Sequence, residues 1–190
     1  MPIVGALMGF FFFPAVAVTA PTPTLVSAPK IIPDLPTYIV GITGYNAVPE
    51  QTDEDPFTTA SGAYSNPEVI AARSRDFAEE LPFGTIIEFA APAERQQNCG
   101  YDAVSPEIGY RIIADTMNAR YTNRVDILFA TSSVYSVSGG KRNASELLGN
   151  CRGVTIRVVG RLDGTRPYRF PKTQAALAAL VRGIEPLAVR

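Results

Sequence analysis

Short runs of β-branched and aromatic residues dominate the sequence between residues 38 and 160, and clusters of Gly, Pro, Asn and Asp separate them. Several such runs with turn residues between them predict short strands, and together a small all-β barrel or sandwich. A region of roughly 120 residues can bury about two thirds of its surface, which is enough for independent stability. The predicted strands are residues 38–43, 84–89, 110–114, 124–129 and 154–159.

Only two segments carry helical signals, residues 143–148 and residues 174–181. The second follows Pro167 and Pro171, and its leucines fall at positions i and i+3. We expect it to be a packing or capping helix; its alanine-rich face offers a partner contact as the alternative. The expected fold class is therefore all-β with minor helices.

The first charged side chain is Lys30, and an apolar run interrupted by glycines and Pro14 precedes it. The length of this run and the small residues 15–17 predict a signal peptide over residues 1–20, although no Lys or Arg precedes it. The alternative is an uncleaved anchor that tethers the protein to a membrane, because the run is just long enough to span a bilayer. Both interpretations place the rest of the chain outside the cytoplasm, in the cell envelope or secreted.

Prolines divide the remaining chain into segments. Residues 21–36 contain five of them and are expected to form a stiff, extended linker. The folded domain is predicted over residues 37–160. Residues 161–190 form a C-terminal extension that carries the second predicted helix.

The chain contains no histidine, and its 17 basic and 18 acidic residues give a net charge of −1. Such a chain has no broad cationic surface, so we expect no binding to nucleic acid. Ser-His-Asp and Cys-His nucleophiles and His-ligated metal sites all need an imidazole and are excluded. Acid and base chemistry must fall to carboxylates, lysine or tyrosine, and we expect neither a metal nor a cofactor.

Two cysteines, Cys99 and Cys151, lie in the β region of a chain that we expect to be exported. A disulfide between them is predicted. It would close a loop of about 52 residues, which is worth roughly 4 kcal/mol in the chain-entropy model. The alternative is two free buried thiols. A catalytic cysteine is not expected, because no histidine is present to activate it.

Carboxylates alone can cleave glycosidic bonds, because a protonated acid need only donate to the leaving oxygen while charge builds on the sugar. The acidic residues at 53–55 and 79–80 lie in polar segments and are interpreted as surface groups. Asp115 and Asp126 differ. Asp115 ends an apolar run and Asp126 lies within one, where a carboxylate is costly unless it is paired, hydrogen-bonded or used. The alternative is an aspartate on the wet face of an alternating strand.

Four segments occur in a recognisable order: Thr-Gly-Tyr at 43–45, Thr-Ala-Ser-Gly at 59–62, Leu-Pro-Phe-Gly-Thr at 81–85, and Asp115-Thr-Met followed eleven residues later by Asp126. Over about residues 39–159 this pattern resembles the 3D domain, named for its three aspartates. That domain occurs in peptidoglycan lytic transglycosylases of the membrane-bound A type and in wall-associated bacterial proteins. Rare lipoprotein A barrels and expansins share parts of the pattern. The resemblance implies a six-stranded double-psi β-barrel.

Three positions depart from the family pattern. Met117 stands where the family usually has glycine. The nearest candidate for the first aspartate is Asp76, one residue out of register. Arg73 follows an Ala-Ala pair where rare lipoprotein A barrels carry histidine.

The resemblance implies a mechanism with one acid. The aspartate that matches Asp126 protonates the glycosidic oxygen and then accepts the proton of the muramoyl 6-hydroxyl, which leaves a 1,6-anhydro sugar. Asp115 supports the positive charge or holds Asp126 in place. The remaining implied contacts to peptidoglycan glycan strands are Thr59, Ser61 and Gly62, with Asn118, Tyr121 and Tyr45 as further candidates. Ordinary core packing is the alternative for Tyr45. A monomer is expected.

These observations predict an exported cell-wall protein that acts as a lytic transglycosylase. The loss of glycine at Met117 and the missing first aspartate favour a different class, a non-catalytic glycan-binding module like the expansins. A third candidate is a glycoside hydrolase in which Asp115 and Asp126 act as base and acid across a water molecule. The products of the reaction distinguish the three classes.

Overall fold

The computed structural model describes residues 35–52 and 55–183. The predicted signal or anchor at residues 1–20 and nearly all of the predicted linker lie outside the described residues. Within the described ranges no helix is both long enough and apolar enough to cross a bilayer.

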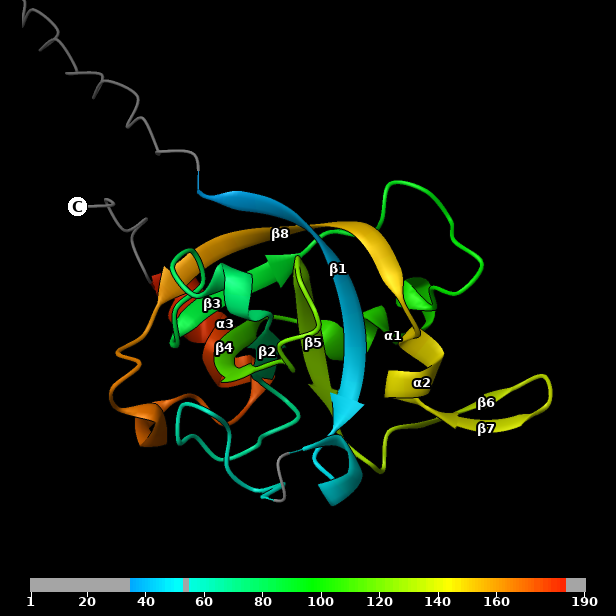
Figure 1. Cartoon of the computed structure of the whole chain (residues 1–190), viewed down its shortest axis with the longest axis horizontal. Helices are drawn as coiled ribbons and strands as arrows, with labels where there is room; N and C mark the ends of the chain where they lie inside the picture. Colours follow the sequence, from blue (N-terminus) through cyan, green and yellow to red (C-terminus); the bar gives the residue numbers. More distant parts are fainter. Residues whose placement is uncertain (1–34, 53–54, 184–190) are drawn as a thin grey trace, which may run out of the picture. The chain divides into compact units, whose positions relative to one another are not determined.

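Six strands close into a barrel in the order β1-β5-β2-β4-β3-β8 (Figure 1). This confirms the expected all-β fold with minor helices. The pairs β1/β5 and β2/β4 are parallel and the other neighbours are antiparallel, an arrangement compatible with a double-psi barrel. The bounds are Thr37–Asn46 for β1, Ile70–Arg73 for β2, Thr85–Phe89 for β3, Arg111–Thr116 for β4, Arg124–Phe129 for β5 and Cys151–Arg161 for β8.

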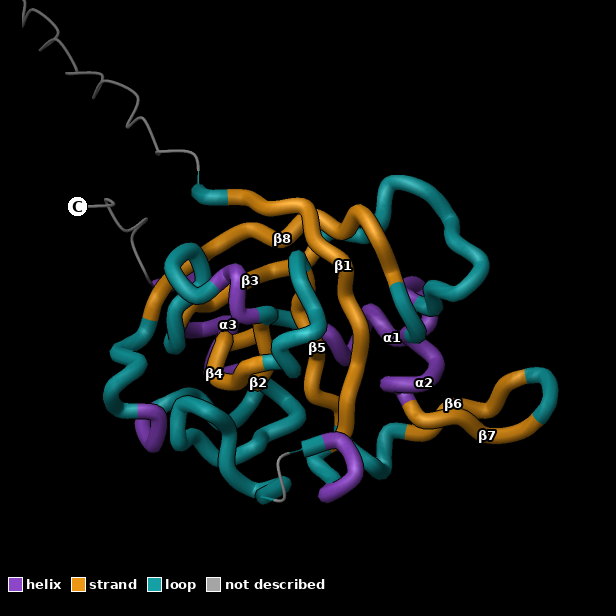
Figure 2. The backbone as a smooth tube through the Cα atoms, in the orientation of Figure 1, coloured by secondary structure: helices purple, strands orange, loops and turns teal. Residues whose placement is uncertain are grey.

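The remaining elements decorate the barrel. Strands β6 (Val134–Val137) and β7 (Gly140–Asn143) pair only with each other, as a hairpin that projects from the barrel (Figure 2). The α-helices are α1 (Tyr101–Ile108), α2 (Ala144–Leu148) and α3 (Gln174–Gly183), and short 3-10 turns cover Pro49–Gln51, Arg75–Phe77 and Pro167–Arg169.

The prediction of only two helical segments was wrong, because α1 forms a third. Its sequence hides the helix, since Pro106 stands inside it and proline normally disrupts a helix interior. Strand β2 was not predicted either. It has four residues, two of them alanines, and alanine is a poor strand former. Pairing with β4 on one side and β5 on the other overrides this weak local preference.

Successive side chains of each strand point to opposite faces of the barrel wall, and each face carries its own cluster of buried apolar residues. All six barrel strands contribute to the inner cluster, which includes Val40, Ala71, Ile87, Ile113, Ile127 and Ile156. The outer cluster uses the alternate positions, such as Ile70, Ala72, Ile86, Ile112 and Leu128, together with Phe170 and Leu177 from the C-terminal extension. Leu177 is fully buried, so α3 packs against the outer wall of the barrel.

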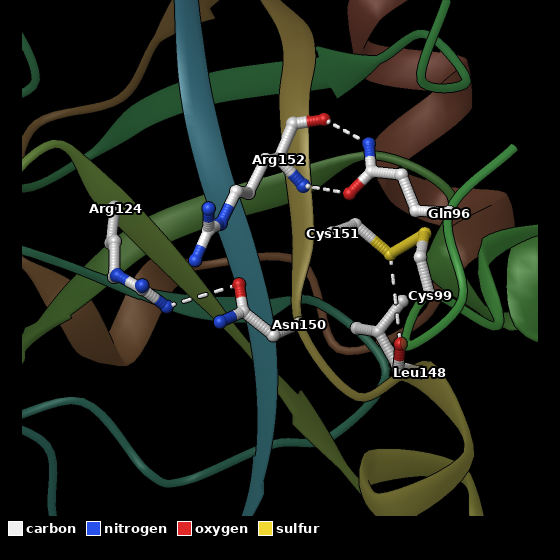
Figure 3. Close-up of a disulfide and its surroundings, with 7 residues drawn as sticks. All are labelled: Gln96, Cys99, Arg124, Leu148, Asn150, Cys151 and Arg152. Atoms are coloured by element: carbon white, nitrogen blue, oxygen red, sulfur yellow. Dashed lines mark hydrogen bonds between the residues drawn. A yellow bond between two sulfur atoms is a disulfide. The ribbon is translucent and has the colours of Figure 1, made fainter. Parts of the chain in front are cut away.

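A disulfide joins Cys99 to Cys151 at the start of β8 (Figure 3). Next to the disulfide, two hydrogen bonds connect the same two segments. The Gln96 side chain donates to the carbonyl of Arg152 at 2.7 Å and accepts from the amide of Arg152 at 2.9 Å. The segment that leads into α1 is therefore fastened to the barrel through a covalent bond and a paired hydrogen bond.

A buried arginine connects α1 to the barrel. Arg111, at the start of β4, is 1% exposed, and desolvation lowers its pKa to about 10, so it remains charged at neutral pH. Its guanidinium satisfies its donors with main-chain carbonyls alone, which avoids the cost of an unpaired buried charge. These carbonyls belong to Pro67, Ile70, Glu107, Ile108 and Leu128.

Gly44 is required where β1 passes beneath α2. A Cβ atom at this position would lie 2.8 Å from the Cα of Ser145 and 2.9 Å from the Cε2 of Phe129. Neither the helix backbone nor the buried ring can withdraw without disturbing the packing, so only glycine allows this close approach. The glycine of the Thr-Gly-Tyr segment therefore has a steric role.

We predict that Gly44→Ala lowers the free energy of unfolding by about 1–3 kcal/mol, the usual cost of overpacking. Urea denaturation measures this. Gly41→Ala on the same strand is the matched control, because the nearest atom to its added Cβ would be the Cγ of Arg124 at an ordinary 3.5 Å. Equal losses in the two variants would contradict the steric explanation.

Candidate functional site

Strand β2 lies between β4 and β5 and brings both aspartates beside the same residue. Ala72 is the direct partner of Asp115 on β4 and of Asp126 on β5. On the next strand, Thr43 of β1 is the partner of Asp126. Directly paired residues project to the same face of a sheet. Thr43, Asp126, Ala72 and Asp115 thus form one row across four strands on the outer wall, which we call the aspartate row.

A β-bulge in β4 places Asp115 in this row. Ala71 pairs with Ile113, but Ala72 pairs with Asp115, so Ala114 is an extra residue on the β4 side. Without the bulge, Asp115 would project with Ile113 into the barrel interior, because residues i and i+2 share a face. Bulges commonly redirect side chains next to active sites.

Asp115 is held at both carboxylate oxygens. Its Oδ1 accepts hydrogen bonds from the amides of Ala60 at 3.0 Å and Thr116 at 2.8 Å. Its Oδ2 accepts from the hydroxyl of Tyr45 at 3.0 Å. With three donors from three segments, the carboxylate has a fixed position beside Ala72.

Tyr45 both packs in the core and contacts the candidate site. Its side chain is 8% exposed and belongs to the outer cluster. Burial and then the charge of Asp115 raise the pKa of Tyr45 well above its ordinary value of 10. The phenol therefore keeps its proton at neutral pH and remains a donor to Asp115.

Asp126 has a different environment from Asp115. Its Oδ1 accepts a hydrogen bond from the Thr43 hydroxyl at 2.8 Å, the one donor to this carboxyl in the described part of the chain. Burial raises the pKa of Asp126 to about 6; the charge of Asp115 adds to the rise, while the Thr43 hydrogen bond and Arg124 oppose it. The side chain stays partly open to solvent. Asp126 can therefore give up or accept a proton close to neutral pH.

The Thr-Ala-Ser-Gly motif at residues 59–62 forms a loop that lies against Asp115. The Ala60 amide contacts the carboxylate, and the Ser61 amide donates to the carbonyl of Ala114 at 3.0 Å. Thr59 is buried, and its hydroxyl accepts from the amide of Ala63 at 3.1 Å, so it stabilises the loop from within. Ser61 is partly exposed and Gly62 is exposed, with Gly62 at a φ of 81° that favours glycine. This loop therefore joins the aspartate row, although Thr59 faces inward.

Asn118 and Tyr121 lie on the turn between the two aspartates. The Asn118 side chain accepts from the amide of Arg120 at 3.1 Å, which shapes the turn. The Tyr121 ring lies beneath the guanidinium groups of Arg120 and Arg124, at 4.8 and 5.8 Å from the ring centroid. In the described residues neither side chain forms a hydrogen bond with Asp115 or Asp126, so both are peripheral to the row.

The three departures from the family pattern have structural explanations. Met117 is buried in the outer cluster, so its side chain adds to the core rather than projecting over the row. Asp76 is exposed and accepts from the amide of Asn123 at 2.8 Å, where the backbone has a φ of 51°. It stabilises the turn before β5. Arg73 is buried and donates to the carbonyl of Leu81 at 2.9 Å.

Sequence reasoning did not assign roles to Thr43 and Ala72. Thr43 was part of a noted motif, and its hydroxyl alternates with the buried Ile42, a signal that it faces outward. Ala72 could be identified only through strand pairing. Its small side chain leaves space between the two carboxyl groups that flank it, and no sequence motif marks this role. No group of three or more metal-binding side chains occurs among the residues that the structure describes.

The sequence was also compared with known proteins. No family model matches the chain, and no curated protein does.

The raised pKa of Asp126 predicts a pH-dependent stability. Its value of about 6 in the folded protein exceeds the roughly 3.9 of an exposed aspartate, so folding favours the neutral form. The associated stability is present below about pH 4 and is lost as the pH rises through about 6. Asparagine is neutral throughout. Asp126→Asn should therefore be more stable than the wild type at pH 7.5, by on the order of 2 kcal/mol, and nearly equal to it at pH 4.

Thermal denaturation at the two pH values measures the difference. Asp76→Asn is the control, because its change in stability between the two pH values should have the opposite sign. Although desolvation opposes it, hydrogen bonds from Ser74 and Asn123 lower the pKa of Asp76, so this variant should lose stability at pH 7.5 relative to pH 4. A change in melting temperature for Asp126→Asn that is the same at both pH values would contradict the account.

Proposed function

We propose that this chain is an exported cell-wall protein with a 3D-type barrel, and that it cleaves peptidoglycan as a lytic transglycosylase. The bond cleaved joins N-acetylmuramic acid to N-acetylglucosamine. The observation that carries the proposal is the aspartate row, in which Asp126 has a pKa of about 6 and Asp115 lies across Ala72 from it. The four motif segments that resemble the 3D domain support the same assignment.

In this proposal Asp126 is first a general acid. Its carboxyl proton passes to the glycosidic oxygen as the bond from that oxygen to C1 of N-acetylmuramic acid breaks. Positive charge develops on C1 and the ring oxygen. Asp115, fixed by Ala60, Thr116 and Tyr45, supplies negative charge that does not need to reorient during the reaction.

Asp126 then acts as a base. Its carboxylate accepts the proton of the muramoyl 6-hydroxyl as that oxygen bonds to C1 and closes a 1,6-anhydro ring. The step returns Asp126 to its protonated state, and no water is consumed. One residue can serve both steps because its pKa lies near the working pH, so neither protonation state is strongly disfavoured.

The contrast between the two carboxyl groups favours unequal roles. Asp115 accepts three hydrogen bonds and Asp126 only one among the described residues. Enzymes that use two carboxyl groups commonly assign the acid to the less solvated one and the electrostatic role to the better hydrogen-bonded one. In this proposal Asp126 is therefore the acid, and Asp115 is the stabilising group.

A glycoside hydrolase, the third candidate from the sequence, uses the same two aspartates. Asp115 and Asp126 stand on strands separated by β2, so they lie two strand spacings apart, roughly 10 Å measured along the curved sheet. Inverting hydrolases place their two carboxyl groups roughly 6.5–9.5 Å apart, with a water between them. In such an enzyme Asp115 would be the base, and the products would carry reducing ends.

Mass spectrometry of peptidoglycan incubated with the full chain tests the proposal. The wild type should release muropeptides with 1,6-anhydro ends, and Asp126→Asn should release none while keeping its cooperative unfolding transition. Asp76→Asn is the matched control, because it removes the charge of an aspartate outside the row and should retain cleavage.

Three other results would each change the functional assignment. Reducing ends instead of anhydro ends would establish the hydrolase, and cleavage by Asp126→Asn would remove Asp126 from the mechanism. Intact glycan that co-sediments with the wild type would indicate a binding module of the expansin kind.

A further inference from the structure

Two tyrosine side chains near the aspartate row are exposed to solvent. Tyr64 is 68% exposed and Tyr168 is 74% exposed. A single exposed aromatic residue needs no explanation. The segments that carry them contact each other, because the Asn66 side chain donates to the carbonyl of Lys172 at 2.8 Å. About 100 positions separate the two tyrosines in the sequence.

Tyr64 belongs to a small hairpin whose tip touches Asp115. Residues 58 and 64 pair as an antiparallel bridge, and the amide of Ser65 donates to the carbonyl of Phe57 at 2.9 Å. At the tip, the amide of Ala60 donates to Asp115. The backbone of the hairpin is thus fixed relative to the aspartate row, and Tyr64 lies four residues beyond this contact in the sequence.

Tyr168 lies in the 3-10 turn Pro167–Arg169, which sits against this hairpin. A Cβ built on Gly62 would lie 4.0 Å from the Cγ of Pro167, and Figure 1 shows the two segments side by side. Phe170, the next residue but one, is buried in the outer cluster and anchors the turn. The guanidinium of Arg169 covers the Tyr168 ring at 5.8 Å from its centroid.

We propose that Tyr64 and Tyr168 form a stacking platform for sugar rings of a glycan strand, outside the bond that Asp126 cleaves. The inference rests on the proposed function and extends its site along the strand. A pyranose ring presents a face of C–H groups that packs on an aromatic ring, while the tyrosine hydroxyl remains free to bond sugar hydroxyls. A rigid ring with two rotatable angles loses little entropy when it binds.

The neighbouring charge suits peptidoglycan in particular. Arg169 is exposed beside the Tyr168 ring and can pair with carboxylates, which peptidoglycan carries on its lactyl-linked stem peptides. Neutral glycans lack this group. The platform therefore predicts a preference for strands that keep their stem peptides and that are long enough to reach past Asp115.

Isothermal titration calorimetry tests the platform with Asp126→Asn protein, which should bind strands without cleaving them. The probes are soluble peptidoglycan strands with stem peptides, of about eight sugars and of two sugars. Tyr64→Ala and Tyr168→Ala should each weaken binding of the long strand by about threefold to tenfold, with little change for the disaccharide. Phe57→Ala is the control, since Phe57 is 66% exposed in the same hairpin but alternates to its other face.

The outcomes separate the two proposals. If the wild type cleaves strands but the tyrosine variants bind the long strand as tightly as Asp126→Asn alone, the platform is wrong and the proposed function stands. Equal losses for Phe57→Ala would also overturn it, because the effect would then not depend on the face that Tyr64 occupies. A wild type that neither binds nor cleaves strands overturns both.

Discussion

The insertion of β2 between β4 and β5 is the constraint on which the candidate site depends. This short strand pairs in parallel with β4 and antiparallel with β5, and it brings Asp115 and Asp126 to either side of Ala72. The bulge at Ala114 is equally necessary, because it turns Asp115 out of the barrel interior. The inner cluster, the buried Arg111 and the Cys99–Cys151 disulfide stabilise the barrel that holds these strands together.

Environment gives the two carboxyl groups of the row different properties. Asp115 is surrounded by donors, and the Tyr45 phenol keeps its proton because burial raises its pKa. Asp126 has a single donor in Thr43 among the described residues and is poorly solvated, which raises its pKa to about 6. At neutral pH Asp126 is mostly ionised, and its burial makes this charged form less favourable in the folded protein than in the unfolded chain. The aspartate therefore lowers the stability of the fold, and such costs are typical of functional positions. The tyrosine platform would then bind the glycan on which this chemistry acts.

Much of the barrel could be predicted from local patterns. The runs around residues 124–129 and 154–159 are strongly apolar and β-branched, and both lie in strands. Strand β2 and helix α1 could not be predicted, because Ala71 and Pro106 contradict the elements that contain them and only tertiary packing forms these elements. Similarly, the sequence indicated Asp115 and Asp126 individually, and the resemblance to the 3D domain indicated residues 59–62. The roles of Thr43 and Ala72 depend on strand register and on a bulge, which no local pattern encodes.

The central claim is that Asp126 is an acid with a proton to give near neutral pH. Carbon-13 NMR of the aspartate carboxyl groups, recorded against pH with Asp126→Asn to assign the resonance, measures this directly. The account predicts an apparent pKa of about 6 for Asp126. A carboxyl resonance that titrates near 4, as an exposed aspartate does, would contradict it, because Asp126 would then be ionised at neutral pH and could not protonate a glycosidic oxygen.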